Sequence, residues 1–194
     1  MTDVNPARAP TGRSAPGGQD KTSAETVNDQ QLVALVELLF FAYRDFVGEP
    51  DALLADLGFG RAHHRVLHFV NINPGLRVAD LLQKLKITKQ SLSRVLKQLV
   101  DLDYVVQETG SVDRRERRLH LTDKGRTLAD HLLTLQKRRL AKALDAAGPD
   151  SVKTAALFLA SVIEATDRPT AQELIDRALG AKRKPARKRS PERV

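Results

Sequence analysis

The stretch of sequence that decides the fold is VADLLQKLKITKQSLSRVLKQLVDLDYVVQETGSVDRRERRLHLTDKG, residues 78–125. It begins with a predicted short helix over 78–85 and a brief turn, after which Thr88 is a favourable N-cap for a second helix over 89–102. Apolar side chains recur in the second helix at the i, i+3, i+4, i+7 spacing of one buried stripe: Leu92, Val95, Leu96 and Leu99. Two short helices joined by a tight turn make a helix-turn-helix, whose second helix can enter a DNA major groove.

The opposite face of the helix over 89–102 carries small polar and basic side chains, which can reach base edges and phosphates without blocking the approach of the helix. This face includes Gln98. The residues that we expect to contact DNA are Thr88, Gln90, Ser91, Ser93, Arg94 and Lys97. Helix pairs of this kind also occur in many proteins that bind no nucleic acid, so the pattern alone leaves a purely structural interpretation open.

The segment that follows predicts a β-hairpin, which turns the motif into a winged helix. Residues 104–108 and 117–121 form its two strands, and residues 109–116 form a turn-prone tip. Four arginines cluster in this region, Arg114, Arg115, Arg117 and Arg118, and we expect the first three to contact DNA. Arginines on such a tip can enter the narrow, strongly negative minor groove beside an occupied major groove. The cluster therefore favours nucleic-acid binding over a merely solvated loop.

The helices predicted before this region indicate a second subunit. A helix over 30–47 is apolar on nearly all sides, so it must be buried on nearly all sides. In a chain this small, a partner subunit is the expected source of the missing cover. A short helical turn over 50–56 follows Pro50, and a helix over 60–72 is stopped by the Asn-Pro-Gly of residues 73–75.

The helices predicted after the hairpin agree with a dimer. Thr122 can cap a long helix through about residue 146, and another helix over 150–166 should end at Pro169. Thr170-x-x-Glu173 is a capping-box pattern for a final short helix. The fold class that we predict is mainly α: a winged helix-turn-helix with a two-stranded β wing and terminal helices that form a dimerisation module.

Composition and charge divide the chain into five predicted segments. Residues 1–28 are rich in Pro, Gly, Ala, Ser and Thr and form a disordered tail. A dimerisation helix and connector (29–58), a DNA-binding domain (59–125) and C-terminal dimerisation helices (126–180) come next, and a disordered basic tail (181–194) follows. The last segment holds seven Lys or Arg and one Glu, and residues 84–126 hold eleven basic and six acidic side chains. Positive charge in two such places suits a phosphate-bearing partner, although the tail alone could simply aid solubility.

Several classes of protein are excluded. With no cysteine, the chain has no disulfides and no thiolate metal sites. It has no Gly-rich phosphate loop and no Gly-x-Ser-x-Gly elbow, so we expect neither enzyme activity nor a cofactor. No apolar run approaches the roughly 20 residues of a spanning helix, and the N-terminus lacks a secretory-signal pattern. We expect a cytoplasmic protein without a membrane partner.

Two parts of the sequence, the wing and the helix-turn-helix, carry specific motifs. The wing motif is Asp113-x-Arg115-x-x-x-Leu119-x-Leu121-Thr122-x-x-Gly125. The helix-turn-helix motifs are Asn73-Pro74-Gly75-Leu76, Ile87-Thr88 and Ser93-Arg94-Val95-Leu96-x-x-Leu99. With these motifs the sequence resembles the MarR family of transcriptional regulators, most sharply in the wing. The resemblance spans about residues 30–165 and implies a homodimer of winged helices.

The resemblance also implies roles for particular residues. It pairs Asp113 with Arg94 as a structural contact and places Arg115 in the minor groove. Two positions depart from the family pattern. Asp103 stands where glycine is frequent, but aspartate tolerates the left-handed conformation better than most residues. Leu82 stands where a small alanine is common.

Three further residues are candidates for binding a small ligand. In the resembled family, the junction between dimer and DNA-binding parts often holds a small aromatic or acidic ligand, and His64 and His68 could line that junction. Their i, i+4 spacing would also allow them to share a metal ion, but no third ligand is evident, so we predict no metal site. Arg44 could pair with a ligand carboxylate, or it could instead form an intrahelical or intersubunit salt bridge.

The function that we predict is a sequence-specific DNA-binding regulator, a repressor that acts as a homodimer on a pseudo-palindromic operator and is released by a small ligand. One alternative is a constitutive architectural DNA-binding protein without a ligand. The other is a metal-responsive regulator that uses His64 and His68.

Overall fold

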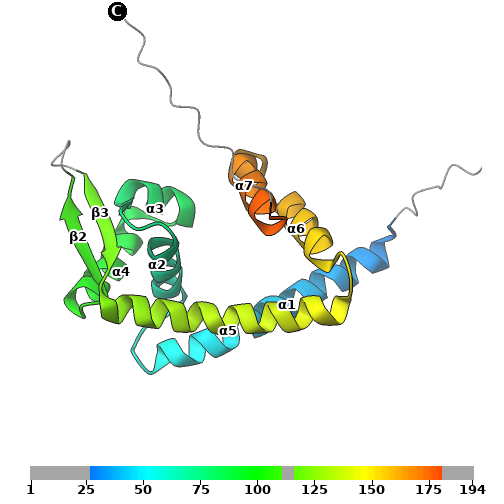
Figure 1. The fold of residues 1–194 in the computed structure, drawn as a ribbon, viewed down its shortest axis with the longest axis horizontal. Helices are drawn as coiled ribbons and strands as arrows, with labels where there is room; N and C mark the ends of the chain where they lie inside the picture. The colour runs from blue at the N-terminus through cyan, green and yellow to red at the C-terminus, as the bar shows by residue number, and fades with distance from the viewer. Residues whose placement is uncertain (1–26, 111–115, 181–194) are drawn as a thin grey trace, which may run out of the picture. The chain divides into compact units, whose positions relative to one another are not determined.

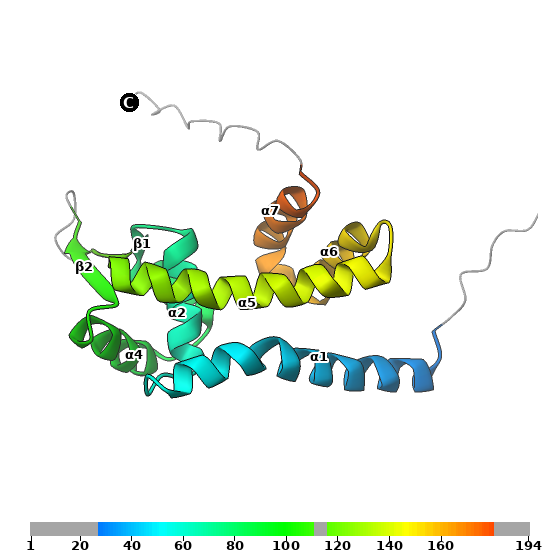
Figure 2. The same cartoon turned by 60° about the horizontal axis from the view of Figure 1, so that its bottom comes forward.

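The computed structural model describes residues 27–110 and 116–180. The chain divides into two compact units, residues 1–40 and 41–194, and each is described by itself. Figures 1 and 2 show the helices and strands in two views. None of the helices in the described part is long and apolar enough to cross a membrane.

The first unit ends within α1, Asp29–Ala55, which continues into the second unit. Its start is fixed by a reciprocal pair of hydrogen bonds: the Asn28 N–H donates to Gln31 Oε1 (2.8 Å), and the Gln31 N–H donates to Asn28 Oδ1 (2.9 Å). The predicted break before residue 50 was wrong, because Pro50 lies inside the helix. The buried side chains of Val47, Pro50 and Leu54 lie on one stripe, and this packing offsets the backbone hydrogen bond that proline cannot donate.

The second unit contains the predicted helix-turn-helix. It consists of α2, Arg61–Ile72, α3, Val78–Leu85, and α4, Lys89–Asp101. Thr88 caps α4 as predicted, because its side chain accepts a hydrogen bond from the Ser91 N–H (3.1 Å). The predicted apolar stripe is buried in full, at Leu92, Val95, Leu96 and Leu99. These side chains belong to one core with leucines and valines of α2 and α3.

The wing is larger than predicted. Strands β2, Val105–Thr109, and β3, Arg117–Leu121, pair antiparallel, with Gln107 opposite Leu119. A third strand, β1, Leu76–Arg77, pairs with the other edge of β3, so the strand order is β1-β3-β2. A strand of two residues is too short to show a sequence alternation, which explains why only a two-stranded wing was predicted.

Two residues other than glycine in the helix-turn-helix region adopt the left-handed conformation. Asp103, directly before the wing, has a φ of 60°. This agrees with the expectation that aspartate adopts the left-handed conformation here, at a position where the resembled family often has glycine. Lys86, at the end of α3, has φ of 50°, and its backbone N–H donates to the Leu82 carbonyl oxygen (3.1 Å). Leu82 itself is partly buried against the core.

The long helix α5, Asp123–Ala147, begins at the base of the wing (Figure 2). Thr122 is its N-cap, as predicted, and accepts a hydrogen bond from the Gly125 N–H (3.0 Å). The helix packs so closely there that a β-carbon on Gly125 would lie 1.9 Å from the Tyr104 carbonyl oxygen. Only glycine therefore fits at this contact.

The C-terminal helices differ from the prediction in their ends. Helix α6, Ser151–Val162, stops before the predicted residue 166, and a short 3₁₀ helix, η1, Ala165–Asp167, follows. The last helix, α7, Arg168–Ala178, contains Pro169 in its first turn, so this proline lies in a helix start instead of ending the helix before it. Proline suits such a position because the first helical N–H groups need no partner within the helix. The predicted capping box at Thr170 is therefore wrong.

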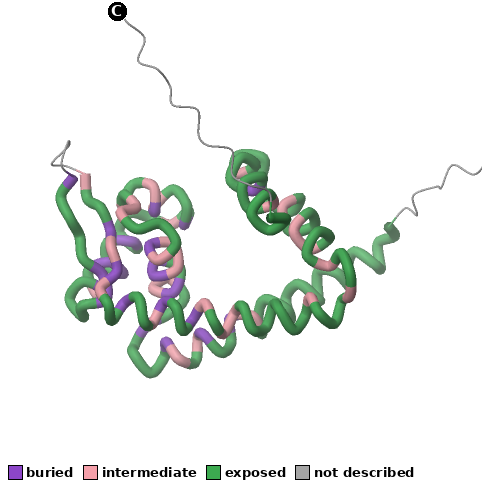
Figure 3. Tube along the Cα trace, viewed as in Figure 1, coloured by how far each residue is buried: buried purple, intermediate pink, exposed green. Residues whose placement is uncertain are grey.

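Buried residues are unevenly distributed. Figure 3 shows that they gather where α2, α3, α4 and the sheet meet the start of α5. Helix α6 contains no buried residue, although Leu157, Phe158, Leu159 and Val162 are apolar. The described residues thus form one well-packed core, and α6 contributes no buried residue to it.

Candidate nucleic-acid interface and cavity

The outward face of α4 presents the predicted DNA-contacting residues to solvent. Gln90, Ser93 and Arg94 are exposed. Thr88 and Ser91 are also exposed, but they serve the helix cap, since the Thr88 hydroxyl donates to Ser91 Oγ (2.8 Å). Lys97 forms an exposed ion pair with Asp101, one turn further along. These residues offer polar hydrogen-bonding groups and two cations, and none of them is apolar.

Gln98 does not belong to this face, contrary to the helical-face pattern. Its Oε1 lies 2.9 Å from His63 Nε2, and its Nε2 donates to the Gly58 carbonyl oxygen (3.3 Å). His63 Nδ1 accepts from the Gly60 N–H (3.1 Å), so its Nε2 carries the proton and donates to Gln98. The ring of His63 also stacks on Phe59, with centroids 4.8 Å apart. These contacts fix α4 on α2. They could not be predicted from helical spacing, because they join residues that are far apart in the sequence.

The wing is described only in part. Arg117 is exposed, and its Nη1 donates to Thr109 Oγ1 on the neighbouring strand (3.2 Å). Asp113, Arg114 and Arg115 lie outside the described residues, so the pair of Asp113 with Arg94 and the contacts of the tip remain predictions.

Two more arginines lie on the sheet next to the tip of the wing. Arg77 on β1 forms two hydrogen bonds of 2.7 Å with Asp80, and its guanidinium holds the pKa of that carboxyl below its usual value. Arg118 on β3 pairs with Glu116 (2.7 Å). The acidic partners offset part of the charge of both arginines. Arg77 was not among the predicted DNA-contacting residues, because the strand that carries it was not predicted.

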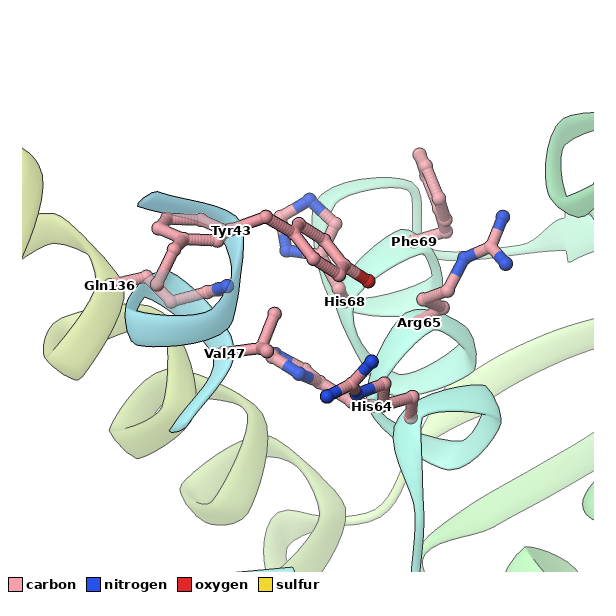
Figure 4. A pocket seen from close by; sticks show the side chains of 9 residues that line it. Tyr43, Val47, His64, Arg65, His68, Phe69 and Gln136 are labelled. Carbon is pink, nitrogen blue, oxygen red and sulfur yellow. The ribbon is translucent and has the colours of Figure 1, made fainter. Parts of the chain in front are cut away.

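A cavity of about 430 Å³ lies between α1, α2 and α5 within the second unit. Its walls are aromatic at Tyr43, Phe46 and Phe69, with His64, His68, Arg61, Arg65 and Gln136 among the polar residues. Figure 4 shows Tyr43 on α1 and His64 and His68 on α2 at this cavity, and the rings of His68 and Phe69 lie edge to face with centroids 5.3 Å apart. Arg61 pairs with Asp51 (2.8 Å) and lies over the Tyr43 ring, 5.5 Å from its centroid. The predicted pair His64 and His68 thus faces one cavity.

Burial disfavours the charged form of both histidines of the cavity. It lowers the pKa of His64 and of His68 below the usual value, because the charged ring is poorly solvated there. Repulsion from the protonated form of His68 also lowers the pKa of His64, while the Asp51 carboxylate and a hydrogen bond with Gln136 raise it. Within residues 27–110 and 116–180, no three or more His, Asp or Glu side chains are grouped to hold a metal ion.

Arg44 does not line this cavity. Its Nε donates to Asp45 Oδ1 (2.8 Å), and its guanidinium lies 4.9 Å from the centroid of the Phe41 ring. This is an intrahelical pair, which was the alternative to a ligand contact. Arg61 and Arg65 are the arginines that the cavity offers instead.

Comparison with known proteins agrees with this architecture. A sequence profile of the MarR family matches residues 57–116. The HTH-type transcriptional regulator PetP of Rhodobacter capsulatus is 46% identical over 138 residues, which cover 71% of this chain and 81% of that protein.

Solved structures share the fold. FabT of Streptococcus pneumoniae, in complex with DNA, has a TM-score of 0.62 and 16% identity, over 74% of this chain and 99% of that one. A mutant MarR from E. coli, complexed with operator DNA, has a TM-score of 0.55 and 19% identity, over 72% of this chain and 100% of that one.

The three-helix core, the recognition-type helix α4 and the antiparallel wing define a winged helix-turn-helix protein. At 46% identity to a curated regulator over most of its length, the chain belongs to the MarR family of transcriptional regulators, which are not enzymes.

Proposed function

We propose that the chain is a cytoplasmic repressor that binds a pseudo-palindromic DNA operator as a homodimer and is released by a small ligand. The observation that carries DNA binding is the division of α4 into two faces. One face is buried in the core at Leu92, Val95, Leu96 and Leu99, while Gln90, Ser93 and Arg94 are exposed on the other. A helix held in this way can place its polar groups against base edges.

The homodimer is supported by apolar helices that the single chain does not cover. All of α6 lacks buried residues, and its Val162 is 62% exposed. In the first unit, α1 likewise exposes large side chains, among them Leu38 (62%) and Phe40 (70%). Apolar surfaces of this extent mark an interface, and a second copy of the chain supplies a surface of the same character.

Ligand release is supported by the cavity between α1, α2 and α5. Its aromatic walls suit a planar ring, and Arg65, which donates to a neutral backbone carbonyl oxygen, supplies a positive charge for an acidic group. Because burial disfavours the charged form of both histidines, they can serve as hydrogen-bonding groups without adding charge. A small aromatic acid is the class of ligand that these groups fit.

Selection of bound DNA from a random pool tests the proposal, with the stoichiometry of the complex measured by light scattering. We expect enrichment of one short inverted repeat bound by two chains. Repeating the selection with aromatic carboxylates such as benzoate tests release. Uniform coating of any duplex would instead support an architectural protein, and release by a divalent metal would support a metal-responsive regulator.

Replacing Arg94 by Ala should weaken binding to the selected operator by about 1–3 kcal/mol and leave binding to random duplex nearly unchanged. In the proposed complex the Arg94 guanidinium contacts a base edge, and one such contact discriminates by this amount. Competition titrations with operator and random duplexes measure both affinities. Lys97→Ala is the comparison variant, since it removes one positive charge from the same helix. An equal loss on every sequence would reduce Arg94 to a phosphate contact.

Deleting residues 181–194 should weaken binding to random duplex more than binding to the operator. The segment carries seven Lys or Arg against one Glu, and it lies outside the described residues. Phosphate contacts release counterions, so the deletion should also flatten the dependence of log affinity on log salt concentration. Titrations of both proteins at several salt concentrations decide the matter. Equal affinities and equal salt dependence for the two proteins would show that the segment has no role in DNA binding.

A further inference from the structure

The turn of the helix-turn-helix holds a lysine where glycine would be the easier residue. Lys86 ends α3 in the left-handed conformation, which costs a residue with a β-carbon about 1 kcal/mol relative to glycine. The recognition-type helix α4 begins three residues later, at Lys89. Contacts that fix the position of Lys86 therefore also fix the start of α4.

The Lys86 side chain makes contacts that glycine could not make. Its Nζ donates to Glu164 Oε2 (2.7 Å) and lies 2.9 Å from Asp167 Oδ2. Both carboxylates raise the pKa of the lysine, which stays charged at neutral pH. The two acids lie at the corner where the chain passes from α6 to α7. Figures 1 and 2 show that α6 and α7 turn back from the far end of α5.

The same turn is held from a second side by α2. Arg65 Nη2 donates to the carbonyl oxygen of Leu85, the residue directly before Lys86 (2.9 Å). The turn thus has one attachment to the core of the DNA-binding part and one to the corner that follows α6. Of these two attachments, only the second leads to α6, a helix with no fully buried residue and with Leu157, Phe158, Leu159 and Val162 exposed.

We propose that Lys86 is a positioning residue, and this proposal rests on the dimer and operator of the proposed function. By binding Glu164 and Asp167, it fixes α4 relative to the C-terminal dimerisation helices. In a dimer, this contact sets the distance and orientation between the two recognition helices, and therefore the half-site spacing that the protein accepts. Its groups are 46–75% exposed, so the ion pairs add little to folding stability, and their effect lies in the placement of α4.

The double variant Glu164→Gln with Asp167→Asn tests the proposal by the sign of its effect. General electrostatics predicts that removing two negative charges strengthens DNA binding. Loss of positioning predicts the opposite on the operator: affinity should fall at least about fivefold, while binding to random duplex is unchanged or rises. The preference for the native half-site spacing over operators lengthened or shortened by two base pairs should shrink. Titration of the three operators and a random duplex gives all of these values.

Two further variants complete the test. Glu173→Gln, which removes a negative charge from an exposed position on α7, is the matched control and should lower neither operator affinity nor spacing preference. The reversed set, Lys86→Glu with Glu164→Lys and Asp167→Lys, should restore the spacing preference. Retention of full preference by the neutral double variant, or no restoration by the reversed set, would overturn the positioning role. If the unmodified protein is monomeric or selects no operator, the proposed function itself fails, which is a separate result.

Discussion

Gly125→Ala should destabilise the fold by roughly 3 kcal/mol or more, the upper range for overpacking a rigid site. The added β-carbon would lie 1.9 Å from the Tyr104 carbonyl oxygen, and backbone atoms cannot swing aside as a flexible side chain can. The same junction holds the N-cap of α5, since Thr122 Oγ1 donates to the Asp103 carbonyl oxygen (2.7 Å). Separating α5 from this segment would therefore also disturb the cap.

Thermal unfolding followed by circular dichroism measures the effect of Gly125→Ala. In a protein of this size, a loss of about 3 kcal/mol lowers Tm by roughly 6–12 °C. Gly48→Ala is the matched control, because Gly48 lies inside α1 with open space around its β-position. Alanine should leave Tm there unchanged or raise it slightly, as alanine favours helix. A Tm for Gly125→Ala within 2 °C of the unmodified protein would show that the junction yields more easily than its geometry indicates.

Leu159→Asp should separate the proposed dimer and lower operator affinity by about a hundredfold or more, since a single half-site loses the gain from simultaneous binding of two. Leu159 is 55% exposed on α6 in the single chain, so the substitution removes no buried contact of the chain itself. In the dimer, the carboxylate would be buried among apolar groups without a partner.

Light scattering and operator titration measure these two effects, and far-UV circular dichroism reports whether the helices persist. Lys153→Asp introduces the same side chain six residues earlier on α6, at a charged exposed position, and should leave the dimer intact. Dimers of unchanged stability in the Leu159 variant would exclude α6 from the interface.

The helix-turn-helix could be predicted because its determinants are local. The stripe from Leu92 to Leu99 follows helical spacing, and the threonine cap at residue 88 lies beside the helix that it starts. Prolines were less informative. Pro50 is tolerated inside α1 because it is buried with Val47 and Leu54. Pro169 lies in the first turn of α7. In both cases, whether the proline ends a helix depends on structure that the neighbouring residues in the sequence do not report.

The candidate site was predictable in part for the same reason. Residues of the α4 face follow from helical spacing, but Gln98 is drawn to His63, which is 35 residues away in sequence. The cavity brings His64 and His68 together as their spacing suggests, yet its arginines are Arg61 and Arg65 instead of Arg44. Which arginine faces a cavity depends on how the helices cross. Helical periodicity in the sequence does not predict the crossing of two helices.

The close contact of Gly125 with Tyr104 has a mechanical consequence. It clamps the wing and α4 to one end of a continuous helix of 25 residues, which at 1.5 Å per residue is a rod of roughly 37 Å. A rod clamped at one end acts as a lever, so a tilt of about 5° displaces its other end by roughly 3 Å over that length. This displacement is close to the rise of about one base pair, since a turn of about 10 base pairs spans roughly 34 Å. Because this junction is closely packed, a small rotation of the subunits in the proposed dimer would shift the recognition helix by a comparable distance relative to the DNA groove.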